Sequence, residues 1–422
     1  MKKRIRESGL WFILGAIANI SIFKIAGNTI FTYCLYLYPL IFAAADKKIQ
    51  VKKNGLGVYA IVSFISVIFC ICNGAMENWY MKAIVSFLNI LLSYILFCYL
   101  TCKEEMMYYF INGIYYGAIA HLVFWIMQVI TWKIFNIDLN SILFGVTSQF
   151  KDHEIVYSGL AIHAGILVPT LVVAILLSDK FYLKIMFMIF GCYTRNTTTL
   201  LTICFYLIAI VCVDYAPCLL AKMKAMNLKK IFQIVCGILV FFLVYQKTQF
   251  SDVVNNSFER VFTVANGEFT SGSDATHMRY LTSFPYIIKN TKLINMLFGN
   301  GVGTSGFVMS KFFNQYTDMV WTIECDWLDI FYSVGAIGWL IIYGNLLFIA
   351  IVGYKINRKY TIYAITIIAS GAFYNFHLHW LIIFEFILSL CIKHKIDIWN
   401  YREFGNFNRK GKINESATNY NN

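Results

Sequence analysis

Charged residues are scarce in this sequence. Asp, Glu, Lys and Arg make up 14% of its 422 residues, whereas apolar residues make up 59% and aromatic residues 18%. A soluble domain carries about a quarter charged residues, so the deficit excludes a protein whose whole surface faces water. Lipid must cover much of this surface.

Several signals that identify other protein classes are missing. The apolar stretches are continuous and not strictly alternating, which excludes a membrane β-barrel. The basic and then apolar N-terminus has no small-residue cleavage site and is expected to stay as a first helix. The 12 cysteines lie almost all in apolar runs, so no disulfide framework is indicated. The basic residues are scattered over loops, and no nucleic-acid-binding module is visible.

Apolar runs of roughly 17–25 residues recur along the whole chain, and each is long enough to cross ~30 Å of hydrocarbon as a helix. The sequence therefore predicts an all-α polytopic integral membrane protein with about 12 transmembrane helices. The predicted spans are 9–27, 29–45, 55–72, 82–101, 108–132, 155–177, 181–194, 198–215, 231–247, 326–352, 360–375 and 378–393.

Positive charge indicates the orientation of these spans, because Lys and Arg gather in short cytoplasmic loops. Clusters at 2–6, 47–53 and 222–230 and in the tail from Lys393 all fall on one side of the membrane. We expect that side, with both termini, to be cytoplasmic. The net charge of +13 follows from this bias and from attraction to anionic lipid headgroups.

One connection is much longer than the rest, and it divides the chain. Helices one to nine are expected in 1–247, a large extracytoplasmic loop in 248–325, helices ten to twelve in 326–393, and a polar, disordered cytoplasmic tail in 394–422. A short helix is predicted over 275–289 within the loop.

The glycine-rich segment FGNGVGTSG, residues 298–306, follows in the same loop. It lacks the Walker lysine of a phosphate-binding loop. We predict a tight turn beneath a helix start, with pyrophosphate binding by its backbone amides as the alternative.

Three arginines are candidates for binding phosphate. Arg195 lies in YTRNTTT, at the turn predicted between the seventh and eighth spans, and Arg260 and Arg279 lie in the large loop. Guanidinium groups bind phosphate oxygens bidentately and stay charged. The segment before the sixth span contains Lys151, His153 and Glu154. It either lines the same outer binding site as the arginines or is a solvated loop.

Acidic residues gather where the large loop returns to the membrane, in the segment TIECDWLDIF. Asp326 and Asp329 share a helical face, whereas Glu324 and Asp326 diverge on a helix. The helix macrodipole favours an acidic residue at a helix N-terminus, which explains at least one of the three. The others are candidates for chemistry.

Two histidines lie at the predicted outer turn of the last hairpin, in FYNFHLHW. The spacing of His377 and His379 is poor for binding metal on a helix, and we predict no metal site. His377 is a candidate hydrogen-bond donor or base. Glu385, deep in the last span, is expected to pair with another span.

Taken together, these features resemble the bacterial O-antigen polymerases of the Wzy type, in the superfamily that includes the O-antigen ligases. The resemblance covers the topology, the segment FGNGVG, the acidic segment IECDWLDIFYSVGAIGWL, Arg195 and Arg279, and weakly KDHEIVYSGLA. Ligases typically have His followed by Asn at the loop's return to the membrane. Here Glu324, Cys325 and Asp326 stand there, which favours a polymerase.

The resemblance implies a GT-C-like glycosyltransferase fold in the bacterial inner membrane. It would join oligosaccharide repeat units carried on undecaprenyl pyrophosphate into O-antigen or capsule, without cofactor or metal and without nucleic acid. A chain-length regulator is a possible protein partner. The base that accepts the attacking hydroxyl's proton would be Glu324, Asp326 or His377, in that order.

Three alternatives remain at this stage: an O-antigen ligase, a flippase or other transporter of lipid-linked oligosaccharides, and a non-enzymatic scaffold or sensor. Transporters place binding groups near the middle of the bilayer, often in discontinuous helices. The sequence predicts that the polar groups lie at the outer surface, and this favours the polymerase.

Overall fold

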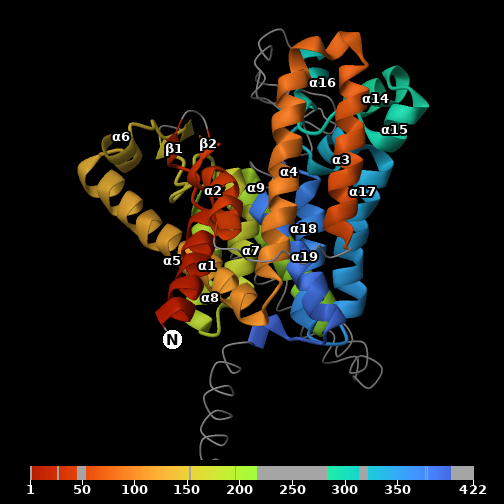
Figure 1. Ribbon diagram of the computed structural model, residues 1–422. Helices are drawn as coiled ribbons and strands as arrows, with labels where there is room; N and C mark the ends of the chain where they lie inside the picture. Colours follow the sequence, from red (N-terminus) through yellow and green to blue (C-terminus); the bar gives the residue numbers. More distant parts are fainter. Residues whose placement is uncertain are drawn as a thin grey trace, which may run out of the picture.

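The computed structural model describes residues 2–25, 28–44, 54–151, 154–194, 196–215, 283–312, 322–375, 377 and 379–400. These residues are almost entirely helical (Figure 1). The predicted ninth span, most of the predicted large loop and most of the tail lie outside the described residues. The start of α1 (Lys2–Ala18) and the 3₁₀-helix Ile398–Asn400 lie at one end of the molecule. The opposite end is formed by α14 (Phe284–Asn290), α15 (Leu293–Phe298) and α16 (Gly306–Phe312) (Figure 1).

The helices occupy the apolar stretches of the sequence. They are α1 Lys2–Ala18, α2 Ile30–Ala44, α3 Gly55–Ile71, α4 Tyr80–Leu100, α5 Glu104–Phe135, α6 Leu139–Phe144, α7 Leu167–Leu177, α8 Phe181–Tyr193, α9 Thr197–Ile210, α14 Phe284–Asn290, α15 Leu293–Phe298, α16 Gly306–Phe312, α17 Asp326–Gly353, α18 Arg358–Gly371 and α19 His379–Lys393. Two antiparallel ladders of two-residue strands join them: β1 Lys24–Ile25 with β2 Asn28–Thr29, and β3 Phe150–Lys151 with β4 Glu154–Ile155.

Four helices among the described residues are long and apolar enough to cross a membrane. They are Met76–Leu100, Glu104–Phe135, Thr197–Tyr215 and Asp326–Gly353. Their exposed side chains include Met81, Ile134 and Leu340, each about as apolar as lipid itself. Together with the low charge content, these are the properties of an all-α membrane protein.

Helices α1 and α5 pack closely because small residues line their contact. A Cβ on Gly113 would lie 2.1 Å from the carbonyl oxygen of Phe12, and one on Gly117 would lie 2.3 Å from that of Ala16. These two glycines form a GxxxG pattern, which allows helix backbones to approach in lipid, where the hydrophobic effect cannot drive association.

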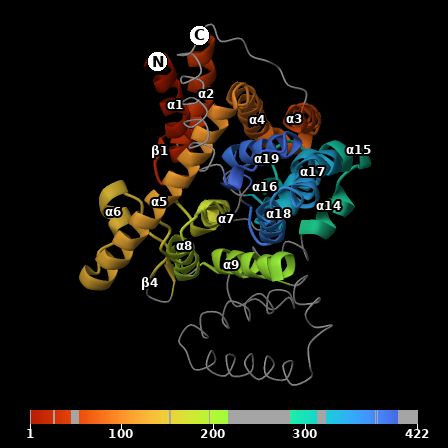
Figure 2. The same ribbon diagram turned by 90° about the horizontal axis from the view of Figure 1, so that it is seen from below.

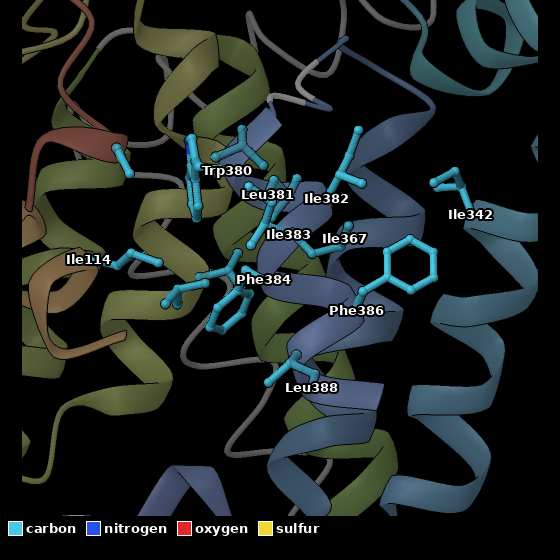
Figure 3. Close-up of a cluster of buried hydrophobic side chains, with 14 of the residues drawn as sticks. Ile114, Ile342, Ile367, Trp380, Leu381, Ile382, Ile383, Phe384, Phe386 and Leu388 are labelled. Atoms are coloured by element: carbon cyan, nitrogen blue, oxygen red, sulfur yellow. The ribbon is translucent and has the colours of Figure 1, made fainter. Parts of the chain in front are cut away.

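Helix α19 is a central helix, since almost its entire circumference is buried. Its apolar side chains project in several directions, with Trp380 and Phe384 on one side and Phe386 toward Ile342 of α17 (Figure 3). Viewed from below, α7 lies between α5 and the group formed by α17, α18 and α19 (Figure 2), and it contacts α5 and α18. A helix that is apolar all round belongs in such an interior position.

Helix α17 differs from the single straight span that we predicted over 326–352. Gly335 adopts φ 70° and ψ −177° and interrupts the helix. Tyr343 and Asp326 are 17 residues apart, yet the Tyr343 hydroxyl donates a 2.7 Å hydrogen bond to Asp326; a straight helix would separate them by ~25 Å. The chain therefore turns back at Gly335, and Asp326 lies inside the bundle. The part of α17 that follows Gly335 is ~27 Å long by itself.

The predicted sixth span over 155–177 is helical only from Ala164 onward. The preceding backbone is non-helical and turns at Gly159, which has φ 59°. Polar side chains of α5 hold it: Gln128 accepts from the amide of Gly159 (2.9 Å), and His121 accepts from that of Leu160 (3.0 Å). Non-helical backbone inside a membrane protein persists only where the protein satisfies its hydrogen bonds. Buried Gln128 and His121 do so here.

Candidate functional site

The glycine-rich segment supports the turn in α17. The amides of Asn300 and Gly301 donate to the carbonyls of Tyr332 and Ser333, at 2.9 and 3.1 Å, next to the break at Gly335. Gly299 has φ 90°, and a Cβ there would lie 2.2 Å from the Ser333 carbonyl oxygen. The backbone approach thus requires glycine, and these two amides are occupied within the protein. This arrangement agrees with the structural interpretation of the segment as a tight turn.

Asp326 is the first residue of α17 and is completely buried. Its carboxylate accepts hydrogen bonds from the Tyr343 hydroxyl and from the backbone amide of His377 (3.2 Å), and it pairs with Nδ1 of the His377 ring. The turn between α18 and α19 is thereby fixed to the start of α17. A buried carboxylate is stable only with partners of this kind.

Glu385 completes this group from α19. Its Oε2 lies 3.4 Å from Nε2 of His377, and the Tyr363 hydroxyl of α18 contacts its other oxygen at 3.5 Å. Glu385 is fully buried, and only 5% of the His377 side chain is exposed. We call Asp326, His377, Glu385 and Tyr343 the buried cluster. Glu385 therefore pairs with another helix, as expected, through Tyr363 of α18. It also contacts His377 in the adjacent turn.

His377 lies between two carboxylates, and this determines its charge. Burial alone would lower the pKa of its imidazole, but Asp326 and Glu385 outweigh burial and raise the pKa to about 10. At neutral pH the ring is therefore an imidazolium that holds both carboxylates. A protonated imidazole cannot accept a further proton.

Asp329 lies one turn along α17 from Asp326. The Asn375 side-chain amide donates a 2.5 Å hydrogen bond to its Oδ2, and donates to Thr322 at 3.2 Å. The two acids thus share a helical face, as predicted, and each fixes a different part of the turn that follows α18.

Glu324 lies outside α17, because Cys325 is the residue that precedes the helix. Glu324 and Asp326 therefore diverge because Glu324 lies before the helix, and not because of their spacing along it. Glu324 is half-buried, and it acts electrostatically on His163, as does Lys24. We call Glu324 and His163 the accessible pair, because the His163 side chain is exposed.

Partial burial lowers the pKa of His163, Lys24 lowers it further, and Glu324 opposes both. Nδ1 of His163 lies 3.1 Å from the Nε2 amide of Gln149. An amide nitrogen can only donate, so Nδ1 accepts and the ring proton is on Nε2. The accessible pair therefore combines a carboxylate with a neutral imidazole, at the end of the non-helical backbone that precedes Ala164.

A polar network supports that edge. The Ser148 hydroxyl donates to Asp138 (2.7 Å), Asn140 donates to Ser148 (3.2 Å), and Gln128 donates to Asn140 (2.8 Å). This chain of hydrogen bonds continues from Gln128 to the amide of Gly159. It connects the loop that carries Gln149 to the segment that carries His163, which fixes their separation.

The other predicted site residues can be placed only in part. Arg195, Arg260, Arg279 and His153 lie outside the described residues. The backbones of Lys151 and Glu154 pair in the β3–β4 ladder, which begins at Phe150, directly after Gln149. Helix α14 begins at Phe284, and the first half of the helix predicted over 275–289 is outside the described residues.

Within the described part of the chain, no group of three or more His, Cys, Asp or Glu side chains is arranged to hold a metal ion. The buried cluster illustrates why. The two ring nitrogens of His377 face different carboxylates, so the three groups flank the ring and do not converge on one point.

The sequence comparisons give no further information about this site. The chain matches none of the known protein families, and the search of the curated proteins finds no significant relative. The site must therefore be interpreted from its own residues.

Our sequence interpretation did not include His163, Gln149 or Tyr343. His163 lies in the apolar stretch GLAIHAGIL, where an ionisable residue is itself a signal of function. Gln149 and Tyr343 had no such signal, because their roles depend on contacts between segments that are distant in sequence.

Proposed function

We propose that this protein is a polymerase that joins oligosaccharide repeat units carried on undecaprenyl pyrophosphate into a surface polysaccharide. The observation that supports this best is the accessible pair, in which the Glu324 carboxylate acts electrostatically on a neutral imidazole, together with a buried cluster that fixes the surrounding helices. The proposal includes about twelve spans in a bacterial inner membrane, cytoplasmic termini, and the accessible pair on the outer side.

The reaction requires one base. A sugar hydroxyl of one lipid-linked unit attacks the anomeric carbon of the other, the new C–O bond forms, and the bond to undecaprenyl pyrophosphate breaks with its electron pair. The hydroxyl proton passes to the Glu324 carboxylate. The leaving group is acidic enough to depart without a general acid, and arginines stabilise its charge.

Glu324 is a better base than the other two candidates. Both oxygens of Asp326 accept hydrogen bonds within the buried cluster, and His377 is already protonated. We assign Asp326 and His377 as positioning residues, which hold α17 and the α18–α19 turn in register behind Glu324. His163, with its proton on Nε2, donates a hydrogen bond to the acceptor sugar or to Glu324.

The pyrophosphate contacts are assigned to Arg195 and Arg279, as in the resemblance described above, with Arg260 beside them. Replacing Arg195 or Arg279 by Ala should abolish polymer, and Lys should restore it poorly because it lacks the bidentate fork. Full-length polymer from both Ala variants would remove these arginines from the mechanism.

The decisive experiment is reconstitution. Purified protein in lipid vesicles, supplied with undecaprenyl-pyrophosphate-linked oligosaccharide and no ATP, should lengthen the glycan into a ladder. Cysteine labelling at Ser273 from outside intact cells, with Lys224 and Lys410 labelled only after permeabilisation, would test the orientation. Absence of a ladder with well-folded protein would overturn the proposal.

A proton-coupled transporter of lipid-linked glycans is the second candidate, and the structure contains two features that favour it. The break at Gly335 and the non-helical backbone before α7 interrupt helices, and transport sites are often formed by such discontinuous helices. Asp326, His377 and Glu385 also form a buried chain of ionisable groups, as in proton relays. Proton uptake by vesicles on addition of the lipid-linked substrate, lost in Glu385→Gln, would favour transport over polymerisation.

A further inference from the structure

The carboxylate of Asp138 joins the start of α6 to the residue that precedes Gln149. Its Oδ1 accepts from the amide of Asn140 (3.1 Å) and from the hydroxyl of Ser148 (2.7 Å), and its Oδ2 accepts from the amide of Ser148 (2.8 Å). Hydrogen bonds to a charged acceptor are roughly twice as strong as neutral ones. Both ends of the segment 139–147 are therefore fixed at one side chain.

Gln149 follows directly, and its backbone is also held on its other side. Its carbonyl accepts from the amide of Val156 (2.7 Å), next to the β3–β4 ladder. Its side chain is exposed, and Nε2 lies 3.1 Å from Nδ1 of His163. A hydrogen bond in contact with water adds little stability by itself. This contact therefore depends on a backbone that already places the amide beside the ring.

Different contacts fix the backbone of His163. The amide of Ile162 donates to the hydroxyl of Ser21 (3.1 Å), and the carbonyl of His163 accepts from the amide of Ile166 (3.2 Å). These partners belong to the segment before β1 and to the 3₁₀-helix Ala164–Ile166, not to α6. A change at Asp138 should therefore move Gln149 and leave the ring in place.

We propose that Asp138 is a positioning residue for His163: by holding Ser148 it places the Gln149 amide on Nδ1, which keeps the imidazole neutral with its proton on Nε2. An amide donor on Nδ1 stabilises the neutral ring, because protonation of Nδ1 would set two donors against each other. Lys24 acts in the same direction, and Glu324 opposes both. The catalytic value of this tautomer rests on the proposed function, but the control of the ring by Asp138 does not.

The sign of the effect distinguishes position from charge. If Asp138 acted on His163 only through its negative charge, its loss would lower the pH at which the ring titrates, because a nearby carboxylate favours the imidazolium. Loss of the Gln149 amide from Nδ1 would instead raise that pH. The two explanations of an Asp138 variant therefore predict opposite shifts.

Four variants and one matched control test the proposal. Asp138→Ala removes the carboxylate, Gln149→Leu removes the donor, and a double variant combines them. Ser148→Ala removes one of the three hydrogen bonds to Asp138 and serves if Asp138→Ala does not fold. The control is Asn357→Ala, because Asn357 caps α18 by accepting from the amide of Lys359 (2.9 Å), as Asp138 caps α6.

The measurement is the rate at which diethyl pyrocarbonate labels His163 as the pH is varied. This reagent reacts with the neutral imidazole and not with the imidazolium, so the pH profile gives the titration midpoint of the ring. Peptide mass spectrometry of the purified full-length chain resolves the residue. Exposed His394 is the reference within each sample.

We expect the midpoint of His163 to rise by roughly 0.5–1 pH unit in Asp138→Ala and in Gln149→Leu. Ser148→Ala should raise it by less. The double variant should shift no further than either single variant, because both changes act through one contact. Asn357→Ala should match wild type.

Three results would overturn the proposal. An unchanged or lowered midpoint in Asp138→Ala, or an unchanged one in Ser148→Ala if Asp138→Ala does not fold, would show that the carboxylate does not place the amide. Additive shifts in the double variant would show that the two residues act separately. An unchanged midpoint in Gln149→Leu would show that the amide does not control the ring. None of these measurements depends on polymer formation, so failure of the proposed function would be seen separately.

Discussion

The buried cluster and the accessible pair contain the same kinds of residue, carboxylates beside a histidine, but they differ in exposure and in the charge of the imidazole. In the buried cluster two carboxylates hold His377 as an imidazolium with only 5% of its side chain exposed. In the accessible pair one carboxylate is near His163, which is exposed and has a lowered pKa. A single carboxylate does not outweigh Lys24 and partial burial, whereas two outweigh full burial.

This difference separates two functions that a sequence cannot distinguish. A buried charged group that is paired with opposite charge inside the protein contributes to position and stability, because breaking the pair leaves a buried charge without its partner. A group that keeps contact with solvent can exchange a proton with a substrate. The two regions should therefore respond in opposite ways to mutation.

The largest contrast should come from Glu324→Gln. This change keeps the shape of the side chain but removes its basicity, so we expect polymer formation to fall by about 10²- to 10⁴-fold. The denaturation temperature should stay near that of wild type. Glu77→Gln, on an exposed acid of the 3₁₀-helix Gly74–Trp79, is the control and should retain activity. Normal ladders from Glu324→Gln would move the base to another residue.

The buried cluster should show the reverse pattern. His377→Ala leaves two buried carboxylates without their cation, which costs about 3–5 kcal/mol of folding free energy. Asp326→Asn leaves the imidazolium with one carboxylate, that of Glu385, and should cost less. We expect lower denaturation temperatures and reduced membrane levels, with loss of activity in proportion to loss of folded protein. His394→Ala, at an exposed histidine beyond α19, should have little effect. A fully stable but inactive His377→Ala would indicate direct participation in chemistry.

His163 should have an intermediate effect on activity. His163→Gln keeps a hydrogen-bond donor and acceptor but removes the titratable imidazole. If the ring only donates a hydrogen bond to substrate, we expect the rate to fall by about tenfold or less. His163→Ala should lose more, since it also releases Gln149. If the ring is instead an acid–base group, His163→Gln and His163→Ala will be equally impaired and the pH–rate profile will lose a limb.

The buried cluster should also make stability depend on pH. The folded-state pKa of His377 is about 10, above its ordinary value of 6.5, so its contribution is complete below pH 6.5 and is lost as pH rises through 10. Wild type should therefore lose denaturation temperature between pH 7 and 10 more steeply than His377→Gln. Parallel curves for the two proteins would show that His377 is not held as an imidazolium.

Much of the architecture could be predicted from local sequence. Most apolar runs gave helices close to their predicted positions, but the first span, predicted over 9–27, ends at Ala18 and is followed by β1. The break between the seventh and eighth predicted spans falls between α8 and α9, where Asn196 caps α9. The glycine-rich segment was predicted to be a turn. These features depend on short-range hydrophobicity, capping and backbone freedom, which neighbouring residues determine.

The positions of the functional groups could not be predicted in this way. Hydropathy showed 326–352 as one apolar run, and nothing in that run revealed that Gly335 turns the chain back, because the conformation depends on Leu297 and Phe298 packing against it. The non-helical conformation of the backbone before α7 similarly depends on hydrogen bonds to Gln128 and His121. We had therefore placed Asp326 at the outer surface, whereas it lies inside the bundle.

The sequence by itself determined that this protein is helical and apolar, since composition and the length of apolar runs depend on no partner. It also supplied Glu324, Asp326 and His377 as candidate bases, in that order. Only the tertiary structure showed that Asp326 and His377 are buried and paired with each other, and only it placed His163 within the electrostatic influence of Glu324 and Glu385 beside His377. The physical reason is that burial, and the set of charges around each group, are properties of the packed chain and decide which carboxylate holds the fold and which can take a proton.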